Sequence, residues 1–347
     1  MKAVKYKTHN LEKCYSIAPL YYQEKQHILV AAEKQDRCML FDEDGAYEET
    51  IWDGPGGTMS MVQIPGSDGV FLATHKFYSP NDGKEAKIVI VTPDGKGQWT
   101  SRVLVELPFV HRFDILSADG KQYIIACTIK SAHEYKDDWR TPGKIWVAEL
   151  PKDLAAYDEQ HQLEMQCLKG DLLKNHGYCK VKCDGEECAV IATESGVFRV
   201  DPPNRDADWQ VKQLTKDPAS DVAFGDFDKD GETEMLVITP FHGDTIKIYK
   251  KSVDSYCCIF TYEFPMEFSH AIWGAHLQDR DVVFLGHRKG KRDLLVMYYD
   301  ETEKTYAATV LDQDVGPANA YFYQKDGEDR LVATNRETNE IAFYRMV

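Results

Sequence analysis

The amino-acid sequence predicts an all-β fold, a seven-bladed β-propeller, from two observations. Its 347 residues contain seven in-phase units, each with an apolar strand, a turn, a second strand rich in Val, Ile, Leu and Ala, and a third strand. Asp-Gly recurs in five of the first turns, and this pair supplies the positive φ that tight hairpins require. Four-stranded units at this period are typical of propellers. Two β-sandwiches, the simpler alternative, do not explain seven copies.

The units follow one another along the chain as a single domain, 1–347. Their second strands read HILVAAE, VFLATHK, YIIACTIK, AVIATES, MLVITPFH, VVFLGHR and RLVATNR. The third strands read CMLF, KIVIV, KIWVAEL, VFRV, IKIYK, LLVMYY and IAFYRM. Apolar, β-branched runs of this length suit strands that are covered on both faces. The predicted blades span 15–54, 55–108, 109–172, 173–216, 217–266, 267–313 and 314–347.

The last unit ends after its third strand, so the segment AVKYKTH at 3–9 is expected to supply its outer strand and to close the ring. Closure of this kind removes exposed sheet edges. The third unit carries two insertions, at 131–143 and 151–171. The second is rich in Leu, Ala, Glu and Gln, which favours a short helix.

Composition narrows the classes of partner. A net charge of −16 opposes general binding to the polyanionic backbone of nucleic acid. No apolar run reaches the roughly 18 residues of a membrane span, and the first residues lack the apolar core of a signal peptide. Nine cysteines without framework spacing favour a reducing cytoplasm. The sequence leaves the oligomeric state open.

The positions of the histidines in the repeat predict that reactive side chains gather on one face of the ring. His111, His176 and His270 each stand eight residues before the first turn of their unit, and so share one repeat position. Four more occur where a second strand ends: His75, His133, His242 and His287. In an antiparallel blade, the start of the first strand and the end of the second lie at the same end. All seven imidazoles are therefore expected around one mouth of the central channel.

A cluster of imidazoles favours a divalent cation such as Zn²⁺ or Mn²⁺, with His111, His176 and His270 as ligands. A metal-free histidine acid–base cluster is the alternative. In the catalytic hypothesis, His75 or His242 removes a proton, and His287 or Tyr135 protonates the leaving oxygen. Charged and polar loop residues are expected to bind and orient the substrate: Glu33, Lys76, Lys130, His133, Arg140, Glu194, Arg288 and Arg336.

The segment GDFDKDGETE at 225–234 opens like a calcium loop, with Asp226, Asp228 and Asp230 as candidate ligands. It has Val237 where such a loop carries its bidentate Glu, and an acidic strand turn is the alternative. This segment resembles the FG-GAP/VCBS type of propeller repeat, whose blades carry a similar Asp-rich, Gly-containing turn. The resemblance covers blade five well and the other turns only at Asp-Gly. It implies the propeller fold.

The scaffold and its histidines are also distantly similar to propeller sugar lyases and dehydratases, such as oligogalacturonate lyase and aldos-2-ulose dehydratase. That resemblance implies a carbon–oxygen lyase or sugar isomerase, which abstracts a proton next to a carbonyl or carboxylate of a sugar acid or keto-sugar. The expected partner is then a small, polar, anionic sugar-like ligand. The alternative is a non-catalytic propeller that binds a glycan or protein through the same face. A glycoside hydrolase using Glu33 and Glu194 is a third hypothesis.

Overall fold

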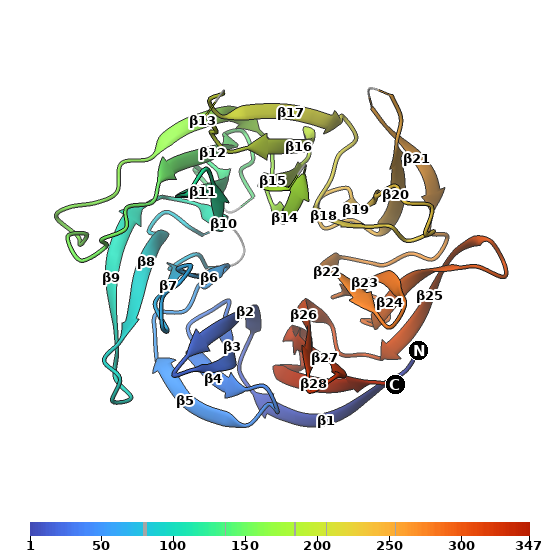
Figure 1. Cartoon of the computed structure of the whole chain (residues 1–347), viewed down its shortest axis with the longest axis horizontal. Helices are drawn as coiled ribbons and strands as arrows, with labels where there is room; N and C mark the ends of the chain where they lie inside the picture. The colour runs from blue at the N-terminus through green and yellow to red at the C-terminus, as the bar shows by residue number, and fades with distance from the viewer. Residues whose placement is uncertain (79–81, 136, 184, 206, 254) are drawn as a thin grey trace.

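Seven four-stranded antiparallel sheets surround a central axis in the computed structural model of the chain (Figure 1). The structure describes residues 1–347 except 79–81, 136, 184, 206 and 254. Among the described residues, the helical content is one 3₁₀ turn, η1 (Arg336–Thr338). The predicted all-β, seven-bladed propeller is confirmed.

The sheets follow the order of the seven predicted units, with the first strand of each nearest the axis (Figure 1). Blade one contains β2 (Cys14–Tyr22), β3 (Lys25–Ala32), β4 (Cys38–Asp42) and β5 (Tyr47–Trp52). Blade two contains β6 (Met61–Gln63), β7 (Phe71–His75), β8 (Lys87–Pro93) and β9 (Trp99–Glu106). Blade three contains β10 (Val110–Ala118), β11 (Lys121–Lys130), β12 (Pro142–Glu149) and β13 (Gln166–Leu172).

The remaining blades have the same plan. Blade four contains β14 (Gly177–Cys183), β15 (Glu186–Thr193), β16 (Gly196–Asp201) and β17 (Gln210–Thr215). Blade five contains β18 (Asp221–Gly225), β19 (Glu234–Thr239), β20 (Thr245–Lys251) and β21 (Tyr256–Thr261). Blade six contains β22 (Ser269–Leu277), β23 (Arg280–His287), β24 (Leu294–Asp300) and β25 (Thr305–Asp312). Blade seven contains β26 (Pro317–Lys325), β27 (Glu328–Asn335), β28 (Glu340–Met346) and β1 (Ala3–Asn10).

Strand burial explains the composition of each unit. The second strands β7 and β19 are buried at every position, because neighbouring blades cover both of their faces. The first turns have the backbone that Asp-Gly predicts: φ is 48° at Asp119 and 75° at Gly120. A turn with positive φ at both central residues matches the twist of its strands, and this twist stacks the blades into a ring.

The N-terminal strand closes the ring as predicted. β1 pairs antiparallel with β28, from Ala3 opposite Met346 to Asn10 opposite Glu340. Lys5 of β1 lies 2.8 Å from carboxylate oxygens of both Asp312 and Glu340. The last blade therefore contains strands from both ends of the chain (Figure 1).

The predicted helix within 151–171 is wrong. This segment forms turns and then enters β13 at Gln166. The carboxylates of Asp153 and Asp158 accept backbone N–H groups within the loop, and such bonds compete with helix formation. Arg102 of β9 also donates to three carbonyl oxygens of the loop and holds it against blade two.

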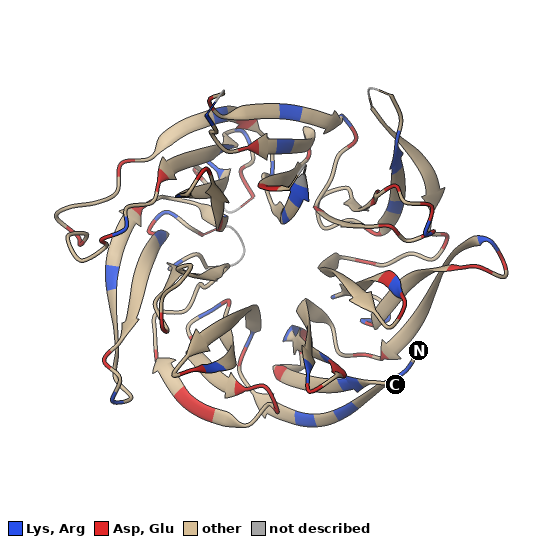
Figure 2. Cartoon of the chain, viewed as in Figure 1, with Lys and Arg blue, Asp and Glu red and all other residues tan. Residues whose placement is uncertain are grey.

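Acidic and basic residues are interspersed around the ring (Figure 2). The excess of acidic residues is therefore distributed over all the blades. In the part of the chain that the structure describes, no helix is long and apolar enough to cross a membrane.

Candidate functional site: a histidine mouth on the central channel

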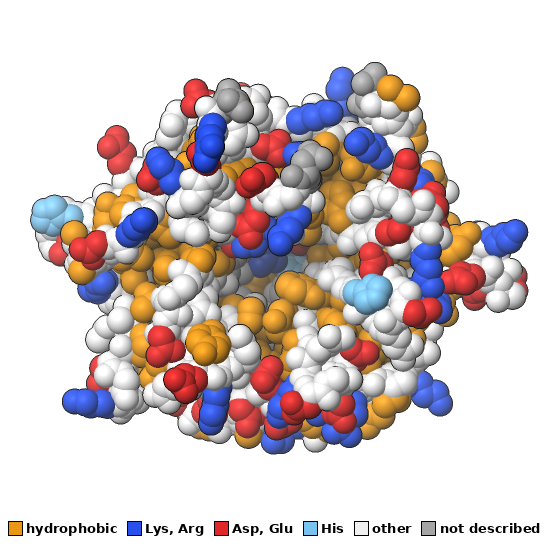
Figure 3. Space-filling model, in the orientation of Figure 1, with side chains coloured by type: hydrophobic (Ala, Val, Ile, Leu, Met, Phe, Trp, Pro, Cys, Tyr) orange, Lys and Arg blue, Asp and Glu red, His pale blue; other side chains and the backbone are white. Residues whose placement is uncertain are grey.

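Four histidines converge at one end of the channel, and we call them the histidine mouth: His111, His176, His242 and His270. His111 and His270 lie near the starts of β10 and β22, His176 directly precedes β14, and His242 follows β19. The ring centroid of His176 lies 4.5 Å from that of His111, 4.7 Å from that of His242 and 5.5 Å from that of His270. Blades three to six thus contribute one imidazole each. The ring is hollowed at its centre, and basic side chains are visible inside (Figure 3).

Backbone carbonyl groups set the tautomers of two of these rings. The Nδ1 atom of His176 is 3.0 Å from the carbonyl oxygen of Ser220, and the Nδ1 atom of His270 is 2.7 Å from that of Ala318. Since a carbonyl oxygen only accepts, both Nδ1 atoms carry protons and both Nε2 atoms present lone pairs. The Nε2 atom of His242 lies 3.1 Å from the Nε2 atom of His176 and donates to it.

Burial keeps the histidine mouth uncharged. Desolvation lowers the pKa of His176 to about 3 and holds the pKa values of the other three well below the ordinary histidine value. The positive charge of Arg112 lowers all four pKa values further, and Arg288 also acts on three of them. At neutral pH the imidazoles are uncharged, with one ring nitrogen protonated and the other free to accept a proton or bind a metal.

The ring nitrogens of His176, His242 and His270 lie within 4.8 Å of one another, close enough to share a metal ion. The ligand set predicted from the sequence has His111 in place of His242. His111 packs against His176 and against the ring of Phe77. Its Nδ1 atom is buried and has no hydrogen-bond partner among the described residues. The structure therefore brings His242, expected to act as a base, into the tightest group of nitrogens.

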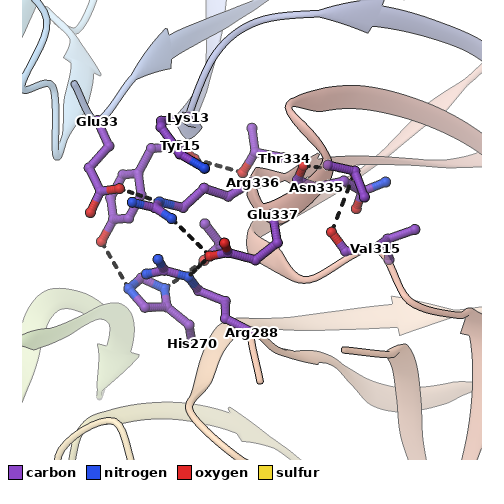
Figure 4. A network of polar contacts seen from close by, with 12 residues as sticks. Lys13, Tyr15, Glu33, His270, Arg288, Val315, Thr334, Asn335, Arg336 and Glu337 are labelled. Carbon is purple, nitrogen blue, oxygen red and sulfur yellow. Dashed lines mark hydrogen bonds and ion pairs between the residues drawn. The ribbon is translucent and has the colours of Figure 1, made fainter. Parts of the chain in front are cut away.

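An ion-pair network joins blades one, six and seven beside the histidine mouth (Figure 4). Arg336 pairs with Glu33 and, at 2.8 Å, with Glu337. Arg288 pairs with the same Glu337, also at 2.8 Å. Burial of Glu337 opposes its ionisation, but Arg288 and Arg336 outweigh that effect and lower its pKa. Three residues expected to bind substrate are thus bonded to one another or to Glu337 in this structure.

Tyr15 of β2 extends this network to the histidines (Figure 4). Its hydroxyl oxygen lies 3.1 Å from the Nε2 atom of His270, and its ring centroid lies 5.8 Å from the guanidinium of Arg112. Burial raises the pKa of Tyr15 to about 12, so the hydroxyl is protonated and donates to His270.

Tyr15, Arg112 and Asp221 were not among the predicted site residues. Asp221 is buried at the start of β18, and desolvation raises its pKa to about 6. Arg112 directly follows the repeated histidine of blade three, and this position is the one sequence signal that points to it. Tyr15 and Asp221 also stand near the starts of inner strands, but no shared residue type marks them there.

The loop between β11 and β12 covers one side of the histidine mouth. The ring of Trp139 packs against Phe241 with centroids 5.4 Å apart, and Phe241 stacks on His242 at 4.0 Å. Lys130 lies buried beneath the loop, 3.9 Å from the centroid of Trp139, and its Nζ atom donates to the carbonyl oxygen of Asp138 at 2.8 Å. Desolvation lowers the pKa of Lys130.

The outer part of this loop presents Tyr135 and Arg140. Arg140 donates to both carboxylate oxygens of Asp138, at 2.8 and 2.7 Å, and it also pairs with Glu134. The guanidinium lies 5.7 Å from the ring centroid of Tyr135. Tyr135 is 59% exposed. The two side chains are therefore held together while the tyrosine ring faces solvent.

The other three predicted histidines do not contact the histidine mouth. His75 packs against Trp52 of blade one, and His133 packs against Phe109. Desolvation lowers the pKa of His75 to about 4 and also lowers that of His133. His287 directs both ring nitrogens at backbone atoms of its own loop.

Lys76 and Glu194, also expected to bind substrate, form local ion pairs. Lys76 lies 3.1 Å from Glu85 at an exposed position. Glu194 lies 3.1 Å from Lys174, and it also accepts the backbone N–H of Phe241. Through Phe241, Glu194 helps to position the loop that carries His242.

The acidic loop of blade five lies at the opposite end of its strands. Ligand atoms of Asp226, Asp228, Asp230 and Glu234 lie within 4.8 Å of one another. The Nζ atom of Lys250, from β20, pairs with Asp228 and Glu234 at 2.9 Å and also with Asp230. An ammonium group therefore supplies positive charge where the sequence predicts calcium.

The comparisons with known proteins identify the fold. No family model and no curated protein matches the sequence. Among solved structures, the β-propeller domain of Cps50 (Swd1) from Myceliophteria thermophila superposes with a TM-score of 0.63 at 9% identity, over 99% of this chain and 100% of that one. BBS1N, solved in complex with ARL6DN, gives 0.61 at 10% identity, over 99% and 97%. The Dos1 propeller gives 0.58 at 11% identity, over 95% and 78%. At these identities the likeness establishes the propeller fold.

Proposed function

We propose that this chain is a binding propeller, which recognises a protein partner with the face that carries the histidine mouth. The observation that carries the proposal is the loop between β11 and β12, where an exposed Tyr135 lies against Arg140 and Trp139 packs against Phe241 of the histidine mouth. Tyrosine and arginine are among the residues that contribute most to protein interfaces. A side chain that is already ordered loses less entropy when a partner binds.

The lining of the mouth suits an inserted group of the partner. Phenylalanine rings pack against the histidines: Phe77 against His111, Phe241 against His176 and His242, and Phe268 against His242 and His270. Uncharged imidazoles and aromatic rings form a surface that is easily desolvated, and Arg112 and Arg288 add positive charge close by. We expect the inserted group to be a carboxylate, because desolvated guanidiniums favour carboxylate partners.

One structural neighbour supports a binding role. BBS1N was solved as a propeller in complex with another protein, ARL6DN. That likeness concerns the fold, and the loop and the mouth of this chain are what support a protein partner.

The proposal is tested with partners captured from cells that express the chain and then purified. The expected result is saturable binding that weakens at least tenfold in a Tyr135→Ala, Arg140→Ala double variant, since truncation of an interface anchor costs about 2 kcal/mol or more. Tyr47→Ala is the matched control, because Tyr47 is also exposed (46%) but lies on the outer strand of blade one. A partner that binds both variants equally well does not use this face, and that result would contradict the proposal.

Catalysis at the same mouth is the second candidate. It is favoured by three lone-pair-bearing imidazoles and a protonated tyrosine within one buried cluster, which can accept and donate protons. If the mouth is catalytic, His242 accepts the proton in place of His75, and Tyr15 donates a proton in place of His287. Both His242 and Tyr15 lie in the cluster. Turnover of a sugar acid or keto-sugar that is abolished by His242→Ala would establish the lyase or isomerase hypothesis instead.

A further inference from the structure

We propose that His176, His242 and His270 form a binding site for one divalent transition-metal ion, such as Zn²⁺. The proposal goes beyond partner recognition and does not depend on it. Its basis is the convergence of three ring nitrogens from three consecutive blades on one buried point.

The spacing of the nitrogens suits a small ion. Zinc–nitrogen bonds are about 2.0–2.1 Å, so two tetrahedral nitrogen ligands lie about 3.3 Å apart. The Nε2 atoms of His176 and His242 are already 3.1 Å apart. All three ligand nitrogens lie within 4.8 Å of one another.

Two of the ligands are oriented as metal-binding histidines are. The carbonyl oxygens of Ser220 and Ala318 accept the Nδ1 protons of His176 and His270. Metal-ligating histidines commonly donate their second ring nitrogen to such an acceptor, which fixes the tautomer and aims the lone pair. His176 and His270 are 1% and 3% exposed, so their rings are held before any ion arrives.

Ligation requires two local rearrangements and no loss of a proton. His242 now donates its Nε2 proton to His176, and moving that proton to Nδ1 makes Nε2 a ligand. The hydroxyl of Tyr15 now donates to the Nε2 atom of His270, and it must turn away when that lone pair binds the ion.

Neighbouring charges determine what the fourth ligand of the ion is. Arg112 and Arg288 lie close enough to lower the pKa values of the three imidazoles, and they also oppose a bound cation. Glu337 offsets Arg288 through their ion pair. An anionic fourth ligand removes the remaining repulsion, so we expect hydroxide or a carboxylate there rather than a neutral donor.

The test uses the full chain without a histidine tag, treated with EDTA and then titrated with Zn²⁺ by calorimetry. A parallel titration with Co²⁺ reports tetrahedral coordination through its visible absorption. We expect one ion per chain. We also expect at least a tenfold loss of affinity in each of three variants: His176→Ala, His242→Ala and His270→Ala.

Two controls make the ligand set specific. His161→Ala removes an exposed histidine outside the mouth. His111→Ala removes the histidine of the mouth that is not one of the three proposed ligands. Both should bind Zn²⁺ within about threefold of wild type. Circular dichroism and thermal unfolding establish that each variant is folded.

Three results would overturn the site. One is less than about a tenth of an equivalent of Zn²⁺ bound by the wild-type chain, a measurement that needs no variant. Another is unchanged affinity in His242→Ala. The third is a loss of Zn²⁺ affinity in His161→Ala as large as the loss in the variants of the three proposed ligands.

Discussion

Two clusters of metal-ligand residues lie at opposite ends of the blades, and they differ in what they already bind. The acidic loop of blade five gathers four carboxylates, and Lys250 places its ammonium among them. The histidine mouth gathers neutral nitrogens whose lone pairs, among the described residues, accept from Tyr15 and from one another. Residue type alone makes both look like cation sites. We infer that the charge already present at the centre of a cluster determines whether the cluster can take up a metal ion.

The largest expected effect tests the acidic loop. Lys250→Met leaves several carboxylates together without their cation, and one of them, Glu234, is fully buried. Loss of one partner of a buried pair costs several kcal/mol, so we expect the free energy of unfolding to fall by about 3 kcal/mol in EDTA. Millimolar Ca²⁺ should restore part of this loss in the variant and leave the wild-type value unchanged. Urea unfolding with and without Ca²⁺ measures both effects.

Lys229→Met is the matched control for that variant. Lys229 also pairs with two carboxylates, Asp279 and Glu301, but at an exposed position. We expect Lys229→Met to change the free energy of unfolding far less than Lys250→Met does, because solvent screens exposed ion pairs. Stabilisation of the wild-type chain by Ca²⁺ would show that the ammonium of Lys250 does not substitute for the ion. The proposed difference between the acidic loop and the histidine mouth would then be wrong.

The next effect tests the neutrality of the histidine mouth in metal-free protein. The pKa of His176 is about 3 in the folded chain and about 6.5 in the unfolded chain. Below pH 6.5 the unfolded chain therefore binds a proton that the folded chain does not, and stability falls with falling pH. The loss is about 1.4 kcal/mol per pH unit, or about 2 kcal/mol per histidine at pH 5. The stability is fully present above pH 6.5.

Urea unfolding of EDTA-treated protein at pH 7 and pH 5 measures this loss. His176→Gln should lose about 2 kcal/mol less than wild type between the two pH values. His161→Gln, at an exposed position, should behave like wild type. Equal losses in all three proteins would mean that His176 is solvated or already protonated in the folded chain.

The smallest expected effect concerns Tyr15. Tyr15→Phe removes the donor to the Nε2 atom of His270 and should cost the metal-free protein about 1 kcal/mol. Because Zn²⁺ would use the same lone pair, the variant should bind Zn²⁺ about fivefold more tightly than wild type. Weaker binding would show that the tyrosine supports the ion, and the account of its hydroxyl as a competitor would be wrong.

The fold was predictable from the sequence because its signals are local and repeated. Asp-Gly turns such as Asp119–Gly120, apolar second strands and the missing strand of the last unit each predict one feature, and together they predict a closed ring. The helix expected within 151–171 failed because Arg102, remote in sequence, holds that segment as a loop.

The site was predictable only in part. Repeat position correctly places His111, His176 and His270 together, since it follows from strand direction. It does not reveal that His75 turns onto Trp52, or that His287 bonds to its own loop. These outcomes depend on side-chain packing between blades. The position of Lys250 likewise depends on the pairing of β20 with β19, which the spacing of the acidic residues does not contain.

Anomalous diffraction from crystals of the tag-free chain, treated with EDTA and then with one equivalent of Zn²⁺, would locate the ion in the folded protein. We expect a single zinc peak about 2.1 Å from ring nitrogens of His176, His242 and His270. A peak among the carboxylates of the acidic loop, or no peak between the three imidazoles, would contradict this expectation.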